Sequence, residues 1–385
     1  MNLATITCMS EPLLMIPGPT PVRDDVLAAL GSPVRSHTSQ ENAATMRAVA
    51  RGIRACVGSD AARVHVFAGS GTLAMEAAVV NHVAAGQRMV VCSQGYFGDR
   101  FAEIGEALGA GVTTVPSSWG SRLDPDALRT ACTQGAPPAL VTITHVDTST
   151  GVLADCAALA AAARECGALV VLDGVCATAG VEEAMDAWGV DVVLTGAQKA
   201  LAVPPGLAIL AVSERARRRR EELGRIPAYY ADLRRWDPGV DEPTRYFSTH
   251  ATSLLRALEV SLQAIEAEGL ERRFARHRRV AAAIRAGFAV LGLTPFTDPE
   301  ALAPTLSALR TPEGVDEAVL RAGMAERGVV VAGCLGPFAG KGIRVGHMGE
   351  VGMAEVERTL LAAAETLGGA AEAVLDAAQA AAASA

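Results

Sequence analysis

The chain has 385 residues, of which 50% are hydrophobic and 20% are charged, so it can bury a large core and does not have the composition of a disordered protein. Its formal net charge of −8 argues against nucleic-acid binding as its main purpose. No apolar run reaches membrane-spanning length, and the first residues do not resemble a signal peptide. We therefore expect a cytoplasmic protein with no membrane or nucleic-acid partner.

The eight cysteines are scattered along the chain without a CxxC pair. This spacing favours reduced, buried thiols over disulfides and provides no metal site. The one basic cluster, "ERARRRREE" at 214–222, carries acids at helical spacing from its arginines. We expect it to form a solvated helix face.

From about residue 45 to 210, short β-branched runs alternate with alanine-rich helical stretches. Most of the runs are continuously apolar, which is typical of strands buried on both faces of a parallel sheet. The alternation predicts an α/β fold with a mostly parallel, doubly wound sheet. The predicted strands are "RVHVFA", "RMVVCS", "ALVTITH", "ALVVLD", "DVVLTG" and "LAILAVS".

The remainder of the chain is predicted to be less regular. Residues 227–250 are expected to be irregular, and a single long helix is expected from Thr252 into the 280s. Beyond about residue 290, "LSALRTP", "GVVVAGC" and "KGIRVGH" are candidate strands of a smaller α+β unit. We expect three parts: an N-terminal arm (1–20), a large domain (21–268) and a small C-terminal domain (269–385).

Ligand chemistry is expected where the strands end. After the first strand, Ser70, Gly71 and Thr72 lead directly into a helix, and free N–H groups at a helix N-terminus suit a phosphate. A plain glycine-rich turn with a capping hydroxyl is the alternative. After the second strand, the aromatic ring of Phe97 is placed either to stack on a flat ligand or simply to pack.

Thr148 lies in a hydroxyl-rich turn after the third strand, where it serves either as a ligand donor or as a turn former. Asp173 ends the next buried strand, where a carboxylate is costly unless a cation meets it. That cation belongs either to a structural salt bridge or to a ligand.

Lys199 follows the strand after that, and the chain contains only one other lysine, Lys341. Unlike arginine, a desolvated lysine can lose its proton and act as a nucleophile. A solvated surface lysine is the alternative for Lys199. Lys341 lies among glycines with no buried strand before it, which makes it a poor candidate for this chemistry.

Together these features match the parts of pyridoxal 5′-phosphate. The helix N-terminus matches its phosphate, the aromatic ring its flat face and the hydroxyls its phenolic oxygen. Asp173 would keep the ring nitrogen protonated, so that the ring can accept electrons from a carbanion, and Lys199 would form a Schiff base with the aldehyde.

From "MIPGPTPV" to "GIRVGHMG", and most specifically in "GAQKAL…PPG" with Asp173 before it, the chain resembles the class V, fold type I pyridoxal-phosphate-dependent aminotransferases of the alanine–glyoxylate and serine–pyruvate group. The resemblance implies that fold and a homodimer with shared active sites. It also implies individual roles: Lys199 for the Schiff base, Asp173 for the ring nitrogen, Phe97 for stacking, Thr148 near the ring, Gly71, Thr72 and Gln198 at the phosphate, Tyr246 and Thr249 at the neighbouring subunit's phosphate, Arg344 for the substrate carboxylate, and Gly18 near the substrate.

The stretch after Asp173 departs from the pattern of that family. Gly174, Cys176 and Ala177 stand in "DGVCATAG" where a serine-containing stretch is usual. These residues change the wall beside the cofactor, so the resemblance does not fix the amino donor.

The leading hypothesis is a ping-pong transamination from a small amino acid, such as alanine or serine, to glyoxylate or pyruvate. Lys199 would act as the general base. The alternatives are an aminophosphonate or pyridoxamine transaminase, or a cysteine desulfurase or lyase, for which Cys334 would be the loop cysteine. A nucleotide-binding protein without catalytic activity is the rival from another class.

Overall fold

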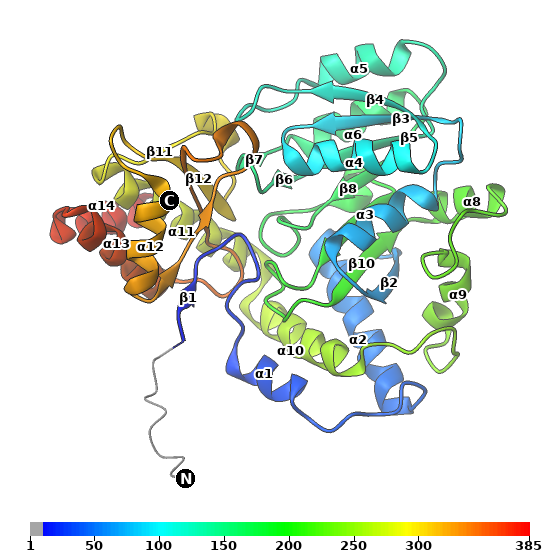
Figure 1. Cartoon of the computed structure of the whole chain (residues 1–385). Helices are drawn as coiled ribbons and strands as arrows, with labels where there is room; N and C mark the ends of the chain where they lie inside the picture. Colours follow the sequence, from blue (N-terminus) through cyan, green and yellow to red (C-terminus); the bar gives the residue numbers. More distant parts are fainter. Residues whose placement is uncertain (1–10) are drawn as a thin grey trace, which may run out of the picture.

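The structure is a computed structural model that describes residues 11–385. The first ten residues of the expected N-terminal arm lie outside the described part. Figure 1 shows a large α/β part on one side, coloured from blue to green, and a smaller part in yellow to red on the other.

A seven-stranded sheet forms the centre of the larger part. All its neighbouring strands are parallel except β10, which runs antiparallel to both of its neighbours. The predicted mostly parallel α/β sheet is therefore confirmed. In spatial order the strands are β2 (Arg63–Ala68), β10 (Leu207–Val212), β9 (Val192–Gly196), β8 (Leu169–Asp173), β5 (Leu140–Thr144), β3 (Arg88–Ser93) and β4 (Gly111–Pro116).

Alternate residues of the central strands enter two different cores. Val90 and Val170 pack into the core on one face of the sheet, while Val91 and Val171 pack into the core on the other. This double burial explains why these strands are continuously apolar in sequence. The first face is covered by α1 (Asp24–Leu30), α2 (Gln40–Val57), α5 (Pro125–Thr133), α6 (Cys156–Glu165) and α10 (Thr252–Glu268), and the second by α3 (Gly71–Val80), α4 (Tyr96–Ala107), α8 (Glu214–Glu222) and α9 (Leu233–Asp241).

The smaller part has its own core around a four-stranded antiparallel sheet. The strand β1 (Leu13–Leu14) joins this part by pairing in parallel with β13 (Val329–Val330), and Met15 is buried in the same core. The sheet contains β11 (Thr294–Pro295), β12 (Leu306–Arg310), β15 (Gly342–Gly346) and β14 (Ala332–Gly333). Its helices are α11 (Leu270–Val290), α12 (Glu317–Glu326), α13 (Met353–Leu367) and α14 (Ala371–Ser384).

Short elements connect these parts. They are the hairpin of β6 (Val146–Asp147) and β7 (Val152–Leu153), the single turn α7 (Met185–Trp188), and the 3₁₀ turns η1 (Pro299–Ala301) and η2 (Gly336–Phe338).

Three expectations from the sequence were wrong in detail. The single helix expected from Thr252 into the 280s is two helices, because Gly269 has φ of +81° and ends α10 before α11 begins. The expected irregular segment 227–250 contains α9, which buries Trp236. The strand β4 was not expected, because it lies at the sheet edge and buries only Val115.

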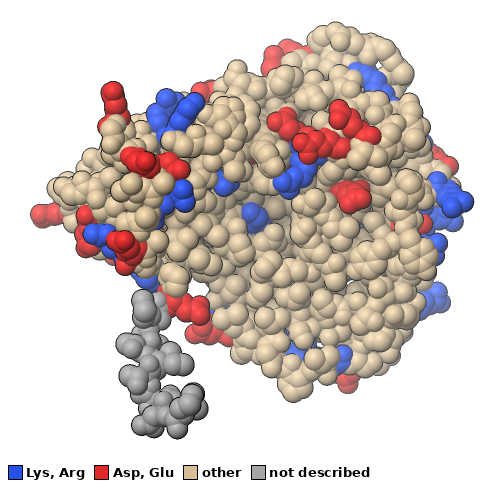
Figure 2. Space-filling view, viewed as in Figure 1, with Lys and Arg blue, Asp and Glu red and all other residues tan. Residues whose placement is uncertain are grey.

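The basic run of α8 is solvated only in part. Arg217 pairs with Glu214 and Glu221 on the exposed face, as expected, but Arg220 is only 2% exposed. Figure 2 shows acidic and basic side chains scattered over this view, with no continuous basic surface among the described residues drawn. No helix within residues 11–385 is both long and apolar enough to cross a membrane.

The buried Arg220 yields a stability prediction. Its Nε and Nη2 donate to Asp232 Oδ1 at 3.0 and 2.8 Å. Replacing Asp232 with alanine leaves a buried guanidinium without its carboxylate, which should lower the free energy of unfolding by about 3–5 kcal/mol. Urea denaturation followed by circular dichroism measures this change. Arg217 lies on α8, as Arg220 does, and provides the control. Arg217→Ala should leave the urea midpoint close to that of wild type, because exposed ion pairs contribute little to stability. Equal midpoints for both variants would contradict the prediction.

Candidate active site

A cavity of about 180 Å³ lies at the carboxyl ends of the parallel strands. It brings together predicted residues that are far apart in sequence, and they come from the segments that follow β2, β3, β5, β8 and β9. The residues that line the cavity are Ser70, Gly71, Thr72, Met75, Phe97, Arg100, Val146, Thr148, Asp173, Val175, Cys176, Gln198 and Lys199.

The N-terminus of α3 forms one end of the cavity. Ser70 has the extended backbone of an N-cap residue, but its side chain caps no N–H group within residues 11–385. The N–H groups of a first helical turn have no partner inside the helix. A β-carbon at position 71 would come within 3.1 Å of Val175, so glycine lets the backbone approach closely here. This end of the cavity suits an anion.

Arg100 connects the N-terminus of α3 to the ring of Phe97, and the sequence did not reveal this role. From α4, its Nη1 donates to Thr72 Oγ1 at 3.1 Å. Its guanidinium carbon lies 4.8 Å from the centre of the Phe97 ring, within cation–π range. Arg100 therefore brings positive charge to the anion end and lies over one face of the Phe97 ring.

Asp147 is a second residue that the sequence analysis missed. Its Oδ2 accepts the N–H groups of Phe97 and Gly98 at 3.0 and 3.2 Å, and its Oδ1 accepts that of Ser149 at 2.9 Å. These bonds fix the start of α4 against the turn that carries Thr148. Burial raises the pKa of Asp147, and the hydrogen bonds that it accepts oppose this shift. The sequence contained a signal for Asp147, because this residue comes shortly after the predicted buried strand "ALVTITH", while Asp173 ends the predicted strand "ALVVLD".

Asp173 ends β8 and is only 3% exposed. Its Oδ1 accepts the N–H of Val175 at 2.9 Å, but no basic side chain of residues 11–385 forms an ion pair with it. Burial raises the pKa of Asp173 to about 7, although the Val175 N–H opposes the shift. The structural salt bridge that would have explained Asp173 is thus not found in the described part of the chain. A ligand that carries an N⁺–H group would supply the missing partner.

Lys199 comes from the turn after β9, the strand next to β8. Its Nζ donates to the Pro17 carbonyl, and its own carbonyl accepts Thr20 Oγ1 at 2.9 Å. A β-carbon on Gly18 would lie 2.5 Å from Lys199 Cδ, so the backbone of Gly18 packs directly against the lysine. The lysine amine therefore faces the cavity beside the N-terminal segment.

Cys176 and Thr148 form another part of the cavity wall. The Cys176 thiol is buried and lies 3.8 Å from Thr148 Oγ1, to which it donates. Val146 and Val175 add apolar surface. This wall, where the sequence departs from the pattern that it resembles, is consequently small and mostly apolar.

Four predicted residues lie outside the cavity lining: Gly18, whose backbone packs against Lys199, and Arg344, Tyr246 and Thr249. Arg344, on β15, donates from Nε to the Gly333 carbonyl at 2.8 Å and from Nη1 to the Thr148 carbonyl at 3.1 Å. It forms no ion pair with an acid among the described residues. Tyr246 is 62% exposed, and its hydroxyl lies 3.5 Å from that of Thr249. The structure therefore brings Arg344 against the cavity turn but leaves Tyr246 and Thr249 at the surface.

The residues present fit pyridoxal 5′-phosphate. The cavity offers a helix N-terminus with a nearby guanidinium at one end, and a buried carboxylate and a lysine amine beyond it. The buried Gln198 Oε1 has no hydrogen-bond partner within residues 11–385, so this amide still has bonding capacity. An anionic, planar ligand with a protonated ring nitrogen would meet each of these groups.

Comparison with known proteins gives the family. The model of the class-V aminotransferases matches residues 25–338. The small subunit of a soluble hydrogenase from Synechococcus sp. is 36% identical, over 92% of this chain and 91% of its own length. The L-aspartate–glyoxylate aminotransferase of Paracoccus denitrificans is 33% identical, over 89% of this chain and 87% of its own. A crystal structure of ureidoglycine–glyoxylate aminotransferase from Bacillus subtilis superimposes with a TM-score of 0.93 at 29% identity, covering 97% of this chain and 99% of that one.

The resemblance inferred from the sequence and the expected fold of these enzymes are thereby confirmed. The chain belongs to the class-V aminotransferase family.

Proposed function

We propose that this aminotransferase uses pyridoxal 5′-phosphate to move an amino group from a small amino acid to glyoxylate or pyruvate. The observation that carries the proposal is the convergence of Asp173 and Lys199, from neighbouring strands, in one cavity that ends at the α3 N-terminus. Glyoxylate as acceptor is supported by the names of the Paracoccus and Bacillus relatives.

Named residues would hold the cofactor. The backbone and hydroxyls of Ser70, Gly71 and Thr72 would bind its phosphate, together with Gln198. Phe97 would stack on the ring, Thr148 would bind at its edge, and Lys199 would be its covalent attachment. When bound, the cofactor supplies an electron sink for the carbanion at the substrate α-carbon.

The remaining steps belong to the protein's own side chains. Lys199 Nζ removes the α-proton of the amino donor. In the second half-reaction it gives a proton to the α-carbon of the amino acid that forms from the 2-oxo acid, and such positioned proton transfer accelerates reactions by about 10²–10⁴-fold. Asp173, without a cation of its own, holds the proton on the ring nitrogen. Arg344 has no carboxylate partner among residues 11–385, and its planar fork suits bidentate binding of the substrate carboxylate.

Two features support transamination of a small substrate over a desulfurase reaction. Val146, Val175 and Cys176 give the cavity a mostly apolar wall, which suits the small side chain of an alanine-like or serine-like substrate. Burial raises the pKa of the Cys334 thiol to about 12, so this cysteine stays protonated near neutral pH and is a poor nucleophile.

The chain is further proposed to act as a homodimer with shared active sites. The exposure of Tyr246 and Thr249 outside the cavity supports a contact with a neighbouring subunit. The division into domains at 21–268 and 269–385 is supported by the break at Gly269. A cytoplasmic location is supported by the cysteines of the described part, all of which are free thiols.

Replacing Lys199 with alanine should abolish the visible absorption band of the cofactor-loaded protein, because no other lysine faces the cavity. Transaminase turnover should fall by about 10³-fold or more. Absorbance spectra after incubation with pyridoxal 5′-phosphate and dialysis test this. Lys341→Ala is the matched control and should keep the band. A Lys199→Ala protein with an unchanged band would refute the assignment.

Asp173 predicts a pH dependence of stability in the cofactor-free protein. Burial raises the pKa of this carboxyl from 3.8 to about 7, so between about pH 4 and pH 7 the folded state binds a proton that the unfolded state has lost. The contribution of Asp173 to stability therefore falls as the pH rises through this window, by up to about 4 kcal/mol. Asp173→Asn, which keeps the Oδ1 acceptor, should be more stable than wild type at pH 8.

Urea denaturation of both cofactor-free proteins at pH 5 and pH 8 measures this effect. The advantage of Asp173→Asn should be smaller at pH 5 and should disappear at pH 8 when pyridoxal 5′-phosphate is added, because the bound ring nitrogen then pairs with Asp173. Wild type more stable than the variant at pH 8 without cofactor would contradict the prediction.

A single-turnover screen tests the amino donor. The loaded protein is mixed with one amino acid and no acceptor, and the 2-oxo acid formed is measured together with loss of the visible band. Alanine or serine should yield about one equivalent of 2-oxo acid per active site, since the reaction stops without an acceptor. Release of sulfide from cysteine, with no 2-oxo acid from any donor, would instead support the desulfurase alternative.

A further inference from the structure

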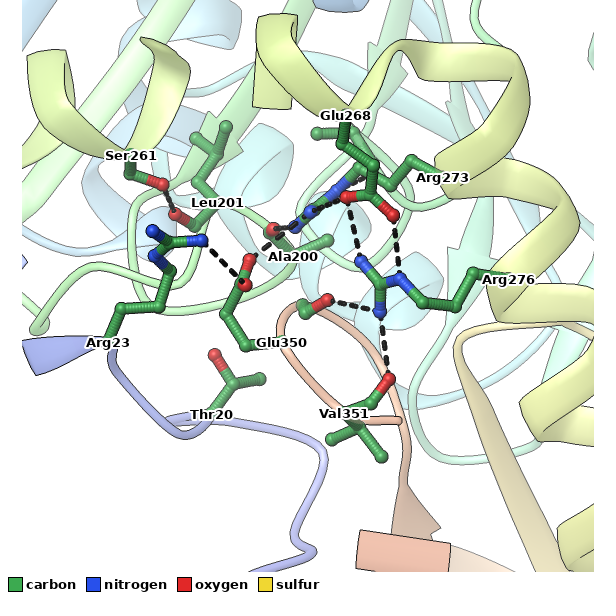
Figure 3. A network of polar contacts seen from close by, with 12 residues as sticks. Thr20, Arg23, Ala200, Leu201, Ser261, Glu268, Arg273, Arg276, Glu350 and Val351 are labelled. Carbon is green, nitrogen blue, oxygen red and sulfur yellow. Dashed lines mark hydrogen bonds and ion pairs between the residues drawn. The ribbon is translucent and has the colours of Figure 1, made fainter. Parts of the chain in front are cut away.

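Outside the cavity, Arg273 on α11 is a buried guanidinium surrounded by acceptors (Figure 3). It is only 1% exposed. Its Nε donates to the Ala179 carbonyl at 3.0 Å and its Nη2 to the Ala200 carbonyl at 2.7 Å. Its Nη1 contacts Glu268 at 2.7 Å and Glu350 at 3.2 Å. Each of its terminal nitrogens therefore has an acceptor, as a buried charge requires.

The two carbonyls belong to the turns that carry the proposed catalytic residues. Ala200 directly follows Lys199, and Ala179 lies in the loop that follows Asp173. The third contact, Glu350, lies in the loop after β15, the strand that carries Arg344. A single guanidinium thus binds three segments that each lead to a residue of the proposed chemistry.

Both turns contain strained backbone. Within residues 11–385, only Ala179 (φ 63°) and Ala202 (φ 52°) are non-glycine residues with positive φ. Ala202 N–H donates to the Lys199 carbonyl at 2.8 Å and closes the turn after the lysine. Such conformations persist where the surroundings hold them in place. Arg273 is the side chain that contacts both turns.

We propose that Arg273 is a positioning residue, which fixes the Lys199 turn and the loop after Asp173 relative to each other and to the C-terminal loop that contains Glu350. This role rests on the proposed functions of Lys199 and Asp173. Arg273 does not line the cavity, so it acts through the backbone that it binds. A displacement of about 1 Å at a reacting group reduces turnover by about 10²-fold. Loss of the Arg273 contacts is therefore expected to reduce turnover even though Arg273 does not touch the substrate.

Arg276 provides a matched control on the same helix. Its Nε and Nη2 pair with the same Glu268 at 2.7 and 2.9 Å, and its Nη1 donates to the Gly349 and Val351 carbonyls at 3.0 and 2.8 Å. It contacts neither Ala179 nor Ala200. Lysine at either position keeps the charge and removes the fork, but only Arg273→Lys removes hydrogen bonds to the carbonyls of Ala179 and Ala200 in the turns of the proposed catalytic residues.

The test compares R273K and R276K with wild type, all loaded with pyridoxal 5′-phosphate. R273K is expected to lower kcat by about 10–100-fold and to change KM for the amino acid by much less. It should also raise the pH midpoint of the visible band by about half a unit or more, because a looser turn admits water to the nitrogen that would join Lys199 to the cofactor and so favours its protonated form. R276K should match wild type in kcat and in this midpoint, whatever its thermal stability.

A wild-type midpoint and kcat in R273K, or the same change in both variants, would overturn the positioning role. If R273K does not fold, as judged by circular dichroism, Glu350→Gln takes its place. This substitution weakens the contact between Arg273 Nη1 and the side chain at position 350. That variant should shift the midpoint in the same direction by a smaller amount, and a wild-type midpoint would then overturn the proposal. If wild type itself shows no visible band with pyridoxal 5′-phosphate, that result contradicts the proposed function and not the positioning role of Arg273.

Discussion

The arrangement of the site depends on one buried carboxylate. Asp173 sits at the end of a strand that is covered on both faces, and no cation of the described chain pairs with it. A buried, unpaired carboxylate is costly, and its pKa rises to about 7 for that reason. A protein retains such a group where a ligand brings the missing charge. The lysine in the turn after the neighbouring strand, the open amide of Gln198 and the helix N-terminus are all arranged around the space where that ligand would lie.

Parallel strands explain why much of this site was predictable from the sequence. Each strand appears as an apolar run, and the residue after the run falls at the same edge of the sheet as the others. Ser70, Phe97, Thr148, Asp173 and Lys199 were found in this way, and the structure places all of them around one cavity. The expectation required only local patterns and the topology that they imply.

Contacts between distant elements were not predictable by the same reasoning. Arg100 is one of many arginines in the sequence, and its relevance depends on the distance from α4 to Thr72 on α3. The edge strand β4 buries too few residues to give an apolar run in the sequence. Arg220 cannot be distinguished in sequence from the solvated arginines beside it, because its burial depends on the contact with Asp232 at the start of α9. Tyr246, Thr249 and Arg344 were identified only by resemblance, and the described chain leaves the first two at its surface.

The chain's strong preference for arginine has a structural use that also explains the exception. Arg220, Arg273 and Arg276 each bind several carbonyls or carboxylates at once through a planar, permanently charged fork. Such a group stabilises fixed backbone but cannot release a proton. In the proposed function, Lys199 occupies the place where a proton must leave and a bond to carbon must form. Pro17 holds its amine from the N-terminal side, while Arg273 holds the next carbonyl from α11. The lysine proposed to react therefore lies in a turn that is fixed from two sides. On one of these sides it is fixed by an arginine, a residue that could not perform the proposed chemistry of Lys199.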